Sequence, residues 1–237
     1  MHRVFHSPVH AGESIADLIH IDAHCHRLPA REGTVGILSH FAGAVQGPES
    51  LPRFSSMGIH PWHAADTDLG TALERMKDAF SDPSCIALGE VGLDRVQGPA
   101  LPEQERVLCA QLALADAHDI PVILHDVRST ADLLRIRKDF PRQTWLLHGF
   151  RGSAALAEQC LGKGFYLSLA PSLLKAEGRG PALCEVIPSD RLFLETDDSG
   201  LDVQDMYDAV RSWSGMDAGT LVAAIERNFI RVFGVQP

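Results

Sequence analysis

The chain has 237 residues, of which 45% are hydrophobic and 22% charged, values that are ordinary for a packed globular domain and exclude a disordered chain. No run of about 18 apolar residues occurs, so we expect no membrane-spanning helix, and the length fits a single domain over residues 1–237. With 21 Lys and Arg against 31 Asp and Glu, the formal net charge is −10. This charge argues against a dedicated nucleic-acid-binding domain, because such domains are usually basic.

Short apolar runs recur along the chain, and most of them end at a histidine or a carboxylate. Each run has the length of a strand and lacks strict alternation, which is typical of strands buried on both faces of a parallel sheet. We therefore predict eight strands within these runs. They lie at 18–26, 34–40, 53–61, 85–90, 121–126, 144–150, 164–170 and 191–197.

Helical patterns separate most of the predicted strands. They occupy 102–118, 129–139, 152–162 and 218–233, whereas 41–52 is too rich in Gly and Pro for a full helix. Strands that alternate with helices in this way predict an α/β fold, a single (β/α)₈ TIM barrel with a shortened second crossover.

The N-terminal residues and the cysteines indicate the cellular compartment in which the protein is expected. The first twenty residues have polar side chains throughout and no apolar core of a signal peptide. Five widely spaced cysteines without a CxxC pair suggest neither a disulfide framework nor a thiolate zinc site. We expect a cytoplasmic protein, and no feature implies a membrane or a protein partner.

Four side chains able to bind metal stand at the ends of apolar runs. In a barrel the C-terminal ends of the strands converge on one face, and catalytic residues gather there. We expect these side chains to meet above the barrel: Glu90, His125, His148 and Asp197.

His24 and His26, spaced i and i+2 on the first predicted strand, would point to the same side of it. A single buried histidine is more often part of the core, and a carboxylate such as Asp94 can simply cap the next helix. Six such residues at converging strand ends favour a site for two divalent cations. In that site Glu90 is the natural bridge, and Asp197 the natural ligand and general base.

The sequence resembles a known family in several motifs. IDAHCH, GIHPWH, GEVGLD, HGFRGS and LETD occur in the order and spacing of the TatD-related metal-dependent deoxyribonucleases, within the amidohydrolase superfamily. The resemblance extends from about residue 20 to 234. It implies a TIM barrel that holds two divalent metals and hydrolyses phosphodiester bonds, often from the 3′ end of DNA.

The resemblance also implies a role for each matching residue. His24 and His26 would bind the first metal, and Glu90 would bridge the two metals. Asp197 would bind the first metal and activate water. The ligands of the second metal would be His125 and His148.

Further residues near these motifs have expected roles in support or in substrate binding. His60 of GIHP matches the family, and we expect it to contact substrate or a ligand rather than the metal. Asp22 would accept the second N–H of a ligating histidine. Arg128, Arg151 and Lys175 are on loops at the catalytic face and could steady a phosphate, although isolated surface charges are common.

Three stretches depart from the family pattern. HDVRST stands where the family usually has HSRDA, and HGFRGS replaces HCFSG. After LETD the chain continues with the acidic DSGLDV in place of a proline-rich loop. Because that loop helps to form the rim of the substrate site, these departures bear on the substrate more than on the metals.

Three hypotheses for the function follow. The first is a dinuclear phosphodiesterase that uses Mg²⁺, Mn²⁺ or Zn²⁺ on the ends of single-stranded DNA or RNA. The second is a hydrolase of small cyclic amides, lactones or esters; many of these bridge their metals with a carboxylated lysine, and Glu90 in that place favours the nuclease. The third, an inactive scaffold, has no need for so many costly polar groups.

Overall fold

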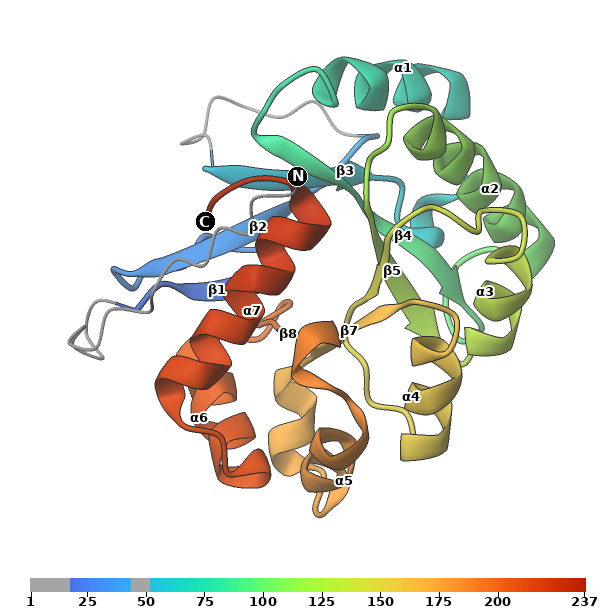
Figure 1. Cartoon of the computed structure of the whole chain (residues 1–237). Helices are drawn as coiled ribbons and strands as arrows, with labels where there is room; N and C mark the ends of the chain where they lie inside the picture. Colours follow the sequence, from blue (N-terminus) through green and yellow to red (C-terminus); the bar gives the residue numbers. More distant parts are fainter. Residues whose placement is uncertain (1–17, 44–51) are drawn as a thin grey trace, which may run out of the picture.

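The strands of the barrel come in chain order around one parallel sheet. The structure, a computed structural model, describes residues 18–43 and 52–237 (Figure 1). Each of the predicted apolar runs coincides with one strand, although β2, β4 and β5 extend past the end of the run, and the prediction of a TIM barrel is confirmed. The strands are β1 His20–Cys25, β2 Thr34–Phe41, β3 Phe54–Gly58, β4 Cys85–Asp94, β5 Val122–Val127, β6 Trp145–Leu147, β7 Tyr166–Leu169 and β8 Leu192–Leu194.

Helices surround the strands on the outside (Figure 1). Those predicted from the sequence are present as α2, α3, α4 and α7, whereas α1, α5 and α6 were not predicted. Residues 26–33, which join β1 to β2, contain no helix. The prediction of a shortened second crossover falls largely on residues 44–51, outside the described residues. The helices are α1 Leu69–Ala79, α2 Leu101–Ala117, α3 Thr130–Ile136, α4 Ala154–Leu161, α5 Arg179–Val186, α6 Val203–Ser214 and α7 Ala218–Phe233.

Burial explains why the strands lack an alternating pattern. All ten residues of β4 are buried, because side chains on one face fill the barrel and those on the other pack under the helices. Several helices begin at an aspartate whose side chain accepts a backbone N–H of the first turn. These N-cap residues are Asp68 of α1, Asp202 of α6 and Asp217 of α7.

The first and last strands meet near their C-terminal ends. Cys25 and Asp197 form a parallel β-bridge, in which the Asp197 N–H donates to the His24 carbonyl at 3.0 Å. The His26 N–H donates to the Asp197 carbonyl at 3.2 Å. These bonds join β1 to the segment after β8 and close the barrel on the side where the candidate ligands lie.

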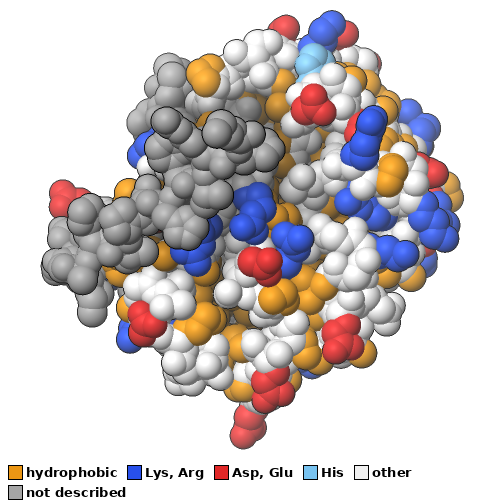
Figure 2. All heavy atoms as spheres, viewed as in Figure 1, with side chains coloured by type: hydrophobic (Ala, Val, Ile, Leu, Met, Phe, Trp, Pro, Cys, Tyr) orange, Lys and Arg blue, Asp and Glu red, His pale blue; other side chains and the backbone are white. Residues whose placement is uncertain are grey.

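The charge of the surface is mixed on the face shown in Figure 2, where acidic and basic side chains occur together outside the grey atoms. The described part of this face therefore shows no broad surface of a single charge sign. No helix within 18–43 and 52–237 is long and apolar enough to cross a membrane.

Candidate metal centre

Glu90 lies at the middle of the predicted ligand set, and its two carboxylate oxygens face different histidines. Oε2 is 3.3 Å from His24 Nε2 and 3.4 Å from His26 Nε2. Oε1 is 2.6 Å from His125 Nδ1 and 2.8 Å from His148 Nε2. The structure therefore brings these predicted residues together in two groups that share one carboxylate.

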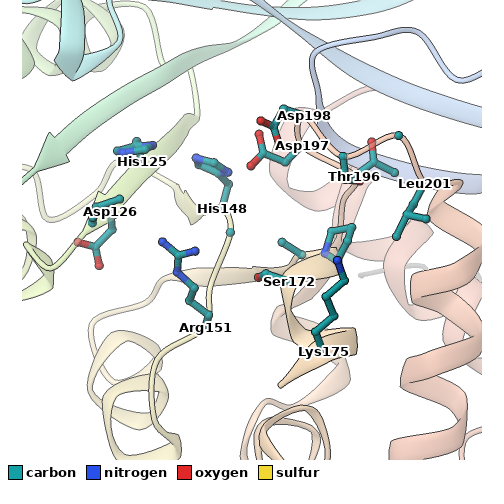
Figure 3. Close-up of a pocket in the computed structure, with 16 residues that line it drawn as sticks. His125, Asp126, His148, Arg151, Ser172, Lys175, Thr196, Asp197, Asp198 and Leu201 are labelled. Carbon is teal, nitrogen blue, oxygen red and sulfur yellow. The ribbon is translucent and has the colours of Figure 1, made fainter. Parts of the chain in front are cut away.

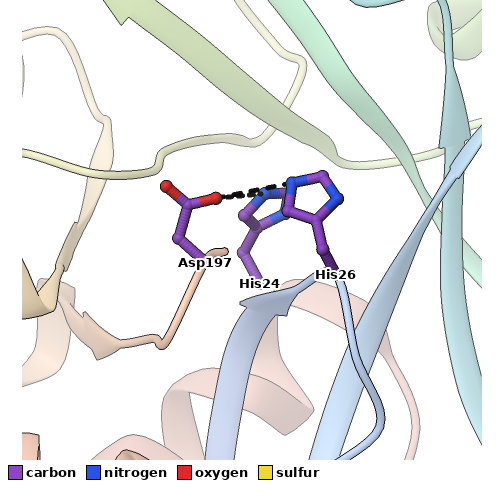
Figure 4. A group of neighbouring side chains, drawn as sticks. All are labelled: His24, His26 and Asp197. Atoms are coloured by element: carbon purple, nitrogen blue, oxygen red, sulfur yellow. Dashed lines mark ion pairs between the residues drawn. The ribbon is translucent and has the colours of Figure 1, made fainter. Parts of the chain in front are cut away.

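Asp197 completes the group on the Oε2 side. Its Oδ1 lies 3.4 Å from His26 Nε2 and 3.7 Å from His24 Nε2, and Figure 4 shows the carboxylate facing both rings. The Asp197 backbone has a φ of 53°, a conformation that few residues other than Gly, Asn and Asp adopt readily. Together with the backbone bonds to β1, this turn directs the carboxylate at the two histidines.

His60 lies on the Oε1 side of Glu90. Its Nε2 is 3.3 Å from Glu90 Oε1 and 3.3 Å from His125 Nδ1. The donor atoms of these three residues lie within 4.8 Å of one another, close enough for all three to reach one cation. The sequence predicted a role for His60 other than ligation, and its position among the donors leaves that role a prediction.

The chemistry of the donors fits divalent cations. His24 is fully buried, and neither of its ring nitrogens has a hydrogen-bond partner among the described residues. A buried imidazole without partners is costly unless something else, such as a metal, takes its lone pair. Imidazole and carboxylate together suit zinc and manganese, and magnesium where carboxylates dominate.

The two carboxylates are ionised at neutral pH. Burial alone would raise the pKa of Glu90, but the charge of His148 and the hydrogen bonds from His125 and His148 hold that pKa well below its usual range. Burial also opposes ionisation of Asp197, yet the hydrogen bond with His26 and the charges of His148 and His24 lower its pKa to about 2.

Metal affinity should rise with pH between about pH 7 and 9. Without metal, the hydrogen bonds to Asp197 and Glu90 raise the pKa of His26 to about 9, so a cation must displace a proton from this ring at neutral pH. The charges of Glu90 and Glu195 also raise the pKa of His148 well above its usual value against the effect of burial, so the apparent affinity should rise by up to about tenfold per pH unit for each of these two rings that loses a proton. Competition with a chromophoric chelator at pH 7.0, 7.5, 8.0 and 8.5 measures the slope. An affinity that does not change over this interval would show that His26 is neutral before metal binds.

Two further carboxylates, Glu195 and Asp94, each lie near the second ring nitrogen of a proposed histidine ligand. The sequence analysis did not assign them this contact. Glu195 is fully buried, and its Oε1 lies 3.2 Å from His148 Nδ1 while accepting the Gly149 N–H at 2.7 Å. Asp94 Oδ2 lies 3.3 Å from His125 Nε2 and accepts the Trp62 indole N–H at 2.7 Å. Ligating histidines commonly turn their second nitrogen to such a carboxylate.

Asp22 differs from its predicted role. Its carboxylate accepts the Thr196 N–H at 2.9 Å and the Thr196 hydroxyl at 2.6 Å, and no hydrogen bond joins it to a histidine ring among the described residues. It therefore ties β1 to the residue before Asp197. Burial raises the pKa of Asp22 to about 7.

Gly92 lets Glu90 and His125 approach each other. It pairs with His125 in the register of β4 and β5, and a Cβ on Gly92 would lie 2.0 Å from the His125 carbonyl oxygen. No other residue fits this contact, which explains the glycine of the GEVGLD motif in terms of strand packing.

Two cavities open beside the centre, and both are lined by His125, His148 and Asp197. The larger, about 650 Å³, also contains Arg151 and Lys175 (Figure 3). The smaller, about 420 Å³, has a wall of rings that includes Phe41, His60, Trp62 and His63.

The third basic residue of the sequence analysis, Arg128, lines an adjoining hollow of about 350 Å³, which shares His148 and Arg151 with the larger cavity. Of the three predicted substrate-binding residues, the structure thus brings His60 and Arg151 to cavities that open on the metal centre, and places Arg128 outside them.

Comparisons with known proteins agree with the motifs. The family model described as TatD related DNase matches residues 34–234. The 3′-5′ ssDNA/RNA exonuclease TatD of Erwinia tasmaniensis is 32% identical over 238 residues, which cover 87% of this chain and 91% of that protein. The same-named protein of Cronobacter turicensis is 37% identical over 155 residues, 61% of this chain and 56% of that protein.

A solved structure supports the fold. YjjV, a TatD homologue from Escherichia coli K12, superposes with a TM-score of 0.78 at 24% identity, covering 94% of this chain and 100% of that one. At that identity the likeness concerns the barrel alone, whereas the family match extends over most of the sequence. The chain belongs to the TatD-related DNase family of metal-dependent hydrolases, as its motifs predicted.

Proposed function

We propose that this protein is a dinuclear metal-dependent nuclease that removes nucleotides from an end of single-stranded DNA or RNA. The observation that carries the dinuclear part is the division of the Glu90 oxygens, one toward His24 and His26 and the other toward His125 and His148. The relatives named 3′-5′ ssDNA/RNA exonuclease support the substrate and the direction.

The proposed ligands divide between two cations. His24, His26 and Asp197 would hold the first, and Glu90 would bridge to the second through its other oxygen. The second would be held by His125 and His148, with His60 within reach. Bound divalent cations supply Lewis acidity, which activates water and stabilises the charge that develops on the phosphate.

Asp197 has the properties of a general base in this centre. Its low pKa keeps the carboxylate ionised at neutral pH, and 35% of the side chain is exposed, toward the cavities. In the proposed reaction the oxygen of a water molecule bonds to phosphorus while the bond from phosphorus to the leaving sugar oxygen breaks. Asp197 takes the water proton and returns it to that sugar oxygen.

The test is hydrolysis of single-stranded DNA and RNA labelled at either the 5′ or the 3′ end, with Mg²⁺, Mn²⁺ or Zn²⁺. A 5′ label should show a ladder of shortening products, and a 3′ label should appear at once as a mononucleotide. If a protein shown by elemental analysis to hold two ions cleaves neither with any of these metals, the proposal is wrong. A panel of cyclic amides, lactones and esters would then identify the alternative hydrolase.

A further inference from the structure

The larger cavity beside the metal centre carries two basic side chains on neighbouring loops. Arg151 follows β6 and His148, and Lys175 ends the short 3₁₀ helix Pro171–Lys175 that follows β7. Figure 3 shows the Arg151 guanidinium beside His148 and Lys175 on the same cavity. Because both cations face a space that opens on the centre, a substrate that enters it passes close to them.

Neither cation is neutralised by a partner. The Arg151 guanidinium and the Lys175 ammonium form no ion pair or hydrogen bond with any described residue, whereas Arg95 and Arg106 pair with carboxylates. The Arg179 guanidinium donates to the Arg151 carbonyl at 2.9 Å and so holds the backbone from which this side chain extends. Two unpaired cations on fixed loops are therefore available to an anion.

Besides Asp197, two carboxylates line the cavity, Asp126 and Asp198, and neither is paired with Arg151 or Lys175. Asp126 accepts the Ser129 N–H at 2.9 Å and hydroxyl at 2.6 Å, and also the Thr130 hydroxyl, so its oxygens are engaged within their own loop. Asp198 lines both cavities, and Figure 3 shows it next to Asp197 and away from Arg151. The side-chain oxygens of Asp126 are thus occupied by donors of their own loop, and neither carboxylate forms an ion pair with Arg151 or Lys175 among the described residues.

Of the two cavities that open on the centre, the larger one has the Lys and Arg among its described lining residues. The smaller cavity, with its wall of rings, has no Lys or Arg among its described lining residues. We propose that Arg151 and Lys175 form a subsite for a second phosphate of the substrate, adjacent in the strand to the phosphate that is cleaved. This inference rests on the proposed nuclease function and narrows its substrate class to strands with at least two phosphates.

Binding of three dinucleotides tests the subsite without turnover. TpT has only the phosphate between its sugars, pTpT adds one at the 5′ end and TpTp adds one at the 3′ end. Titration calorimetry on metal-loaded Asp197→Asn protein should show that one of the latter two binds about 10-fold more tightly than TpT. Arg151→Ala and Lys175→Ala should each reduce that ratio to about 3-fold, and the double variant should remove it.

The matched controls are Arg142→Ala and Lys163→Ala. These residues precede β6 and β7, at the opposite end of the barrel from Arg151 and Lys175, and are likewise exposed. Both variants should still bind the preferred dinucleotide with two phosphates about 10-fold more tightly than TpT. Equal affinities for the three dinucleotides, or a ratio that survives in the double variant, would overturn the subsite.

The subsite and the nuclease proposal can fail separately. If the wild type cleaves none of the end-labelled single strands, and the ratio is present and depends on Arg151 and Lys175, the subsite stands and the nuclease proposal falls. If the wild type cleaves them and the ratio is absent, the nuclease proposal stands and the subsite falls.

Discussion

Asp197→Asn should lower kcat by about 10³-fold while the protein keeps its fold and most of its metal. The amide cannot accept a proton from water, but its oxygen can still face His24 and His26. The bonds that hold residue 197 against β1 come from its backbone, and Asn tolerates the φ of 53° as well as Asp does. The loss should therefore appear in turnover rather than in folding.

The measurement is kcat on end-labelled single-stranded DNA, together with metal content and thermal unfolding. Asp205→Asn, an exposed aspartate in the first turn of α6, is the matched control and should turn over normally. An Asp197→Asn protein with normal kcat would exclude this carboxylate as the base. A variant that loses its metal would instead assign Asp197 a mainly ligating role.

Glu90→Gln should weaken the binding of both cations by more than the roughly 10- to 100-fold that loss of a supporting carboxylate costs a metal site. The amide offers one oxygen, so its NH₂ group must face either the His24 and His26 side or the His125 and His148 side. The substitution also removes the negative charge that both groups share. Binding should therefore be lost at two sites from a single change.

Metal content after dialysis, with zinc affinity by chelator competition, measures this effect. Glu158→Gln, on the exposed face of α4, is the control and should bind as the wild type does. If Glu90→Gln keeps two tightly bound ions, the bridging role is wrong. If it keeps one tightly bound ion, Glu90 belongs to a single site.

The barrel and the convergence of ligands could be predicted from the sequence because parallel strands bring their C-terminal ends to one face. The residue at which each strand ends could not be predicted. β4 continues past Glu90 to Asp94, since a hydrogen-bonded ladder with β5 extends through Gly92. A sequence pattern that ends at a charged residue does not reveal that the charge is buried.

The supporting carboxylates show the same limit. Asp94 could have capped the next helix, but α2 begins at Leu101 after Ala100, and Asp94 instead contacts His125 and Trp62. Glu195 lies in the LETD motif, yet its contact with His148 depends on how two strands distant in the sequence are placed. Such contacts can be identified only once the relative positions of neighbouring strands are known.

The bridge between Cys25 and Asp197 has a consequence for the order in which the protein matures. The donors of the first proposed cation come from the seam where the first and last strands meet, so they do not exist as a set until β8 has been synthesised and docked. A ribosome-bound chain that stops before residue 192 has His24 and His26 but no Asp197. A cation bound here would contact donors from both ends of the sheet. Because it would bind only after β8 has docked against β1, it would stabilise the closed barrel over partly folded chains.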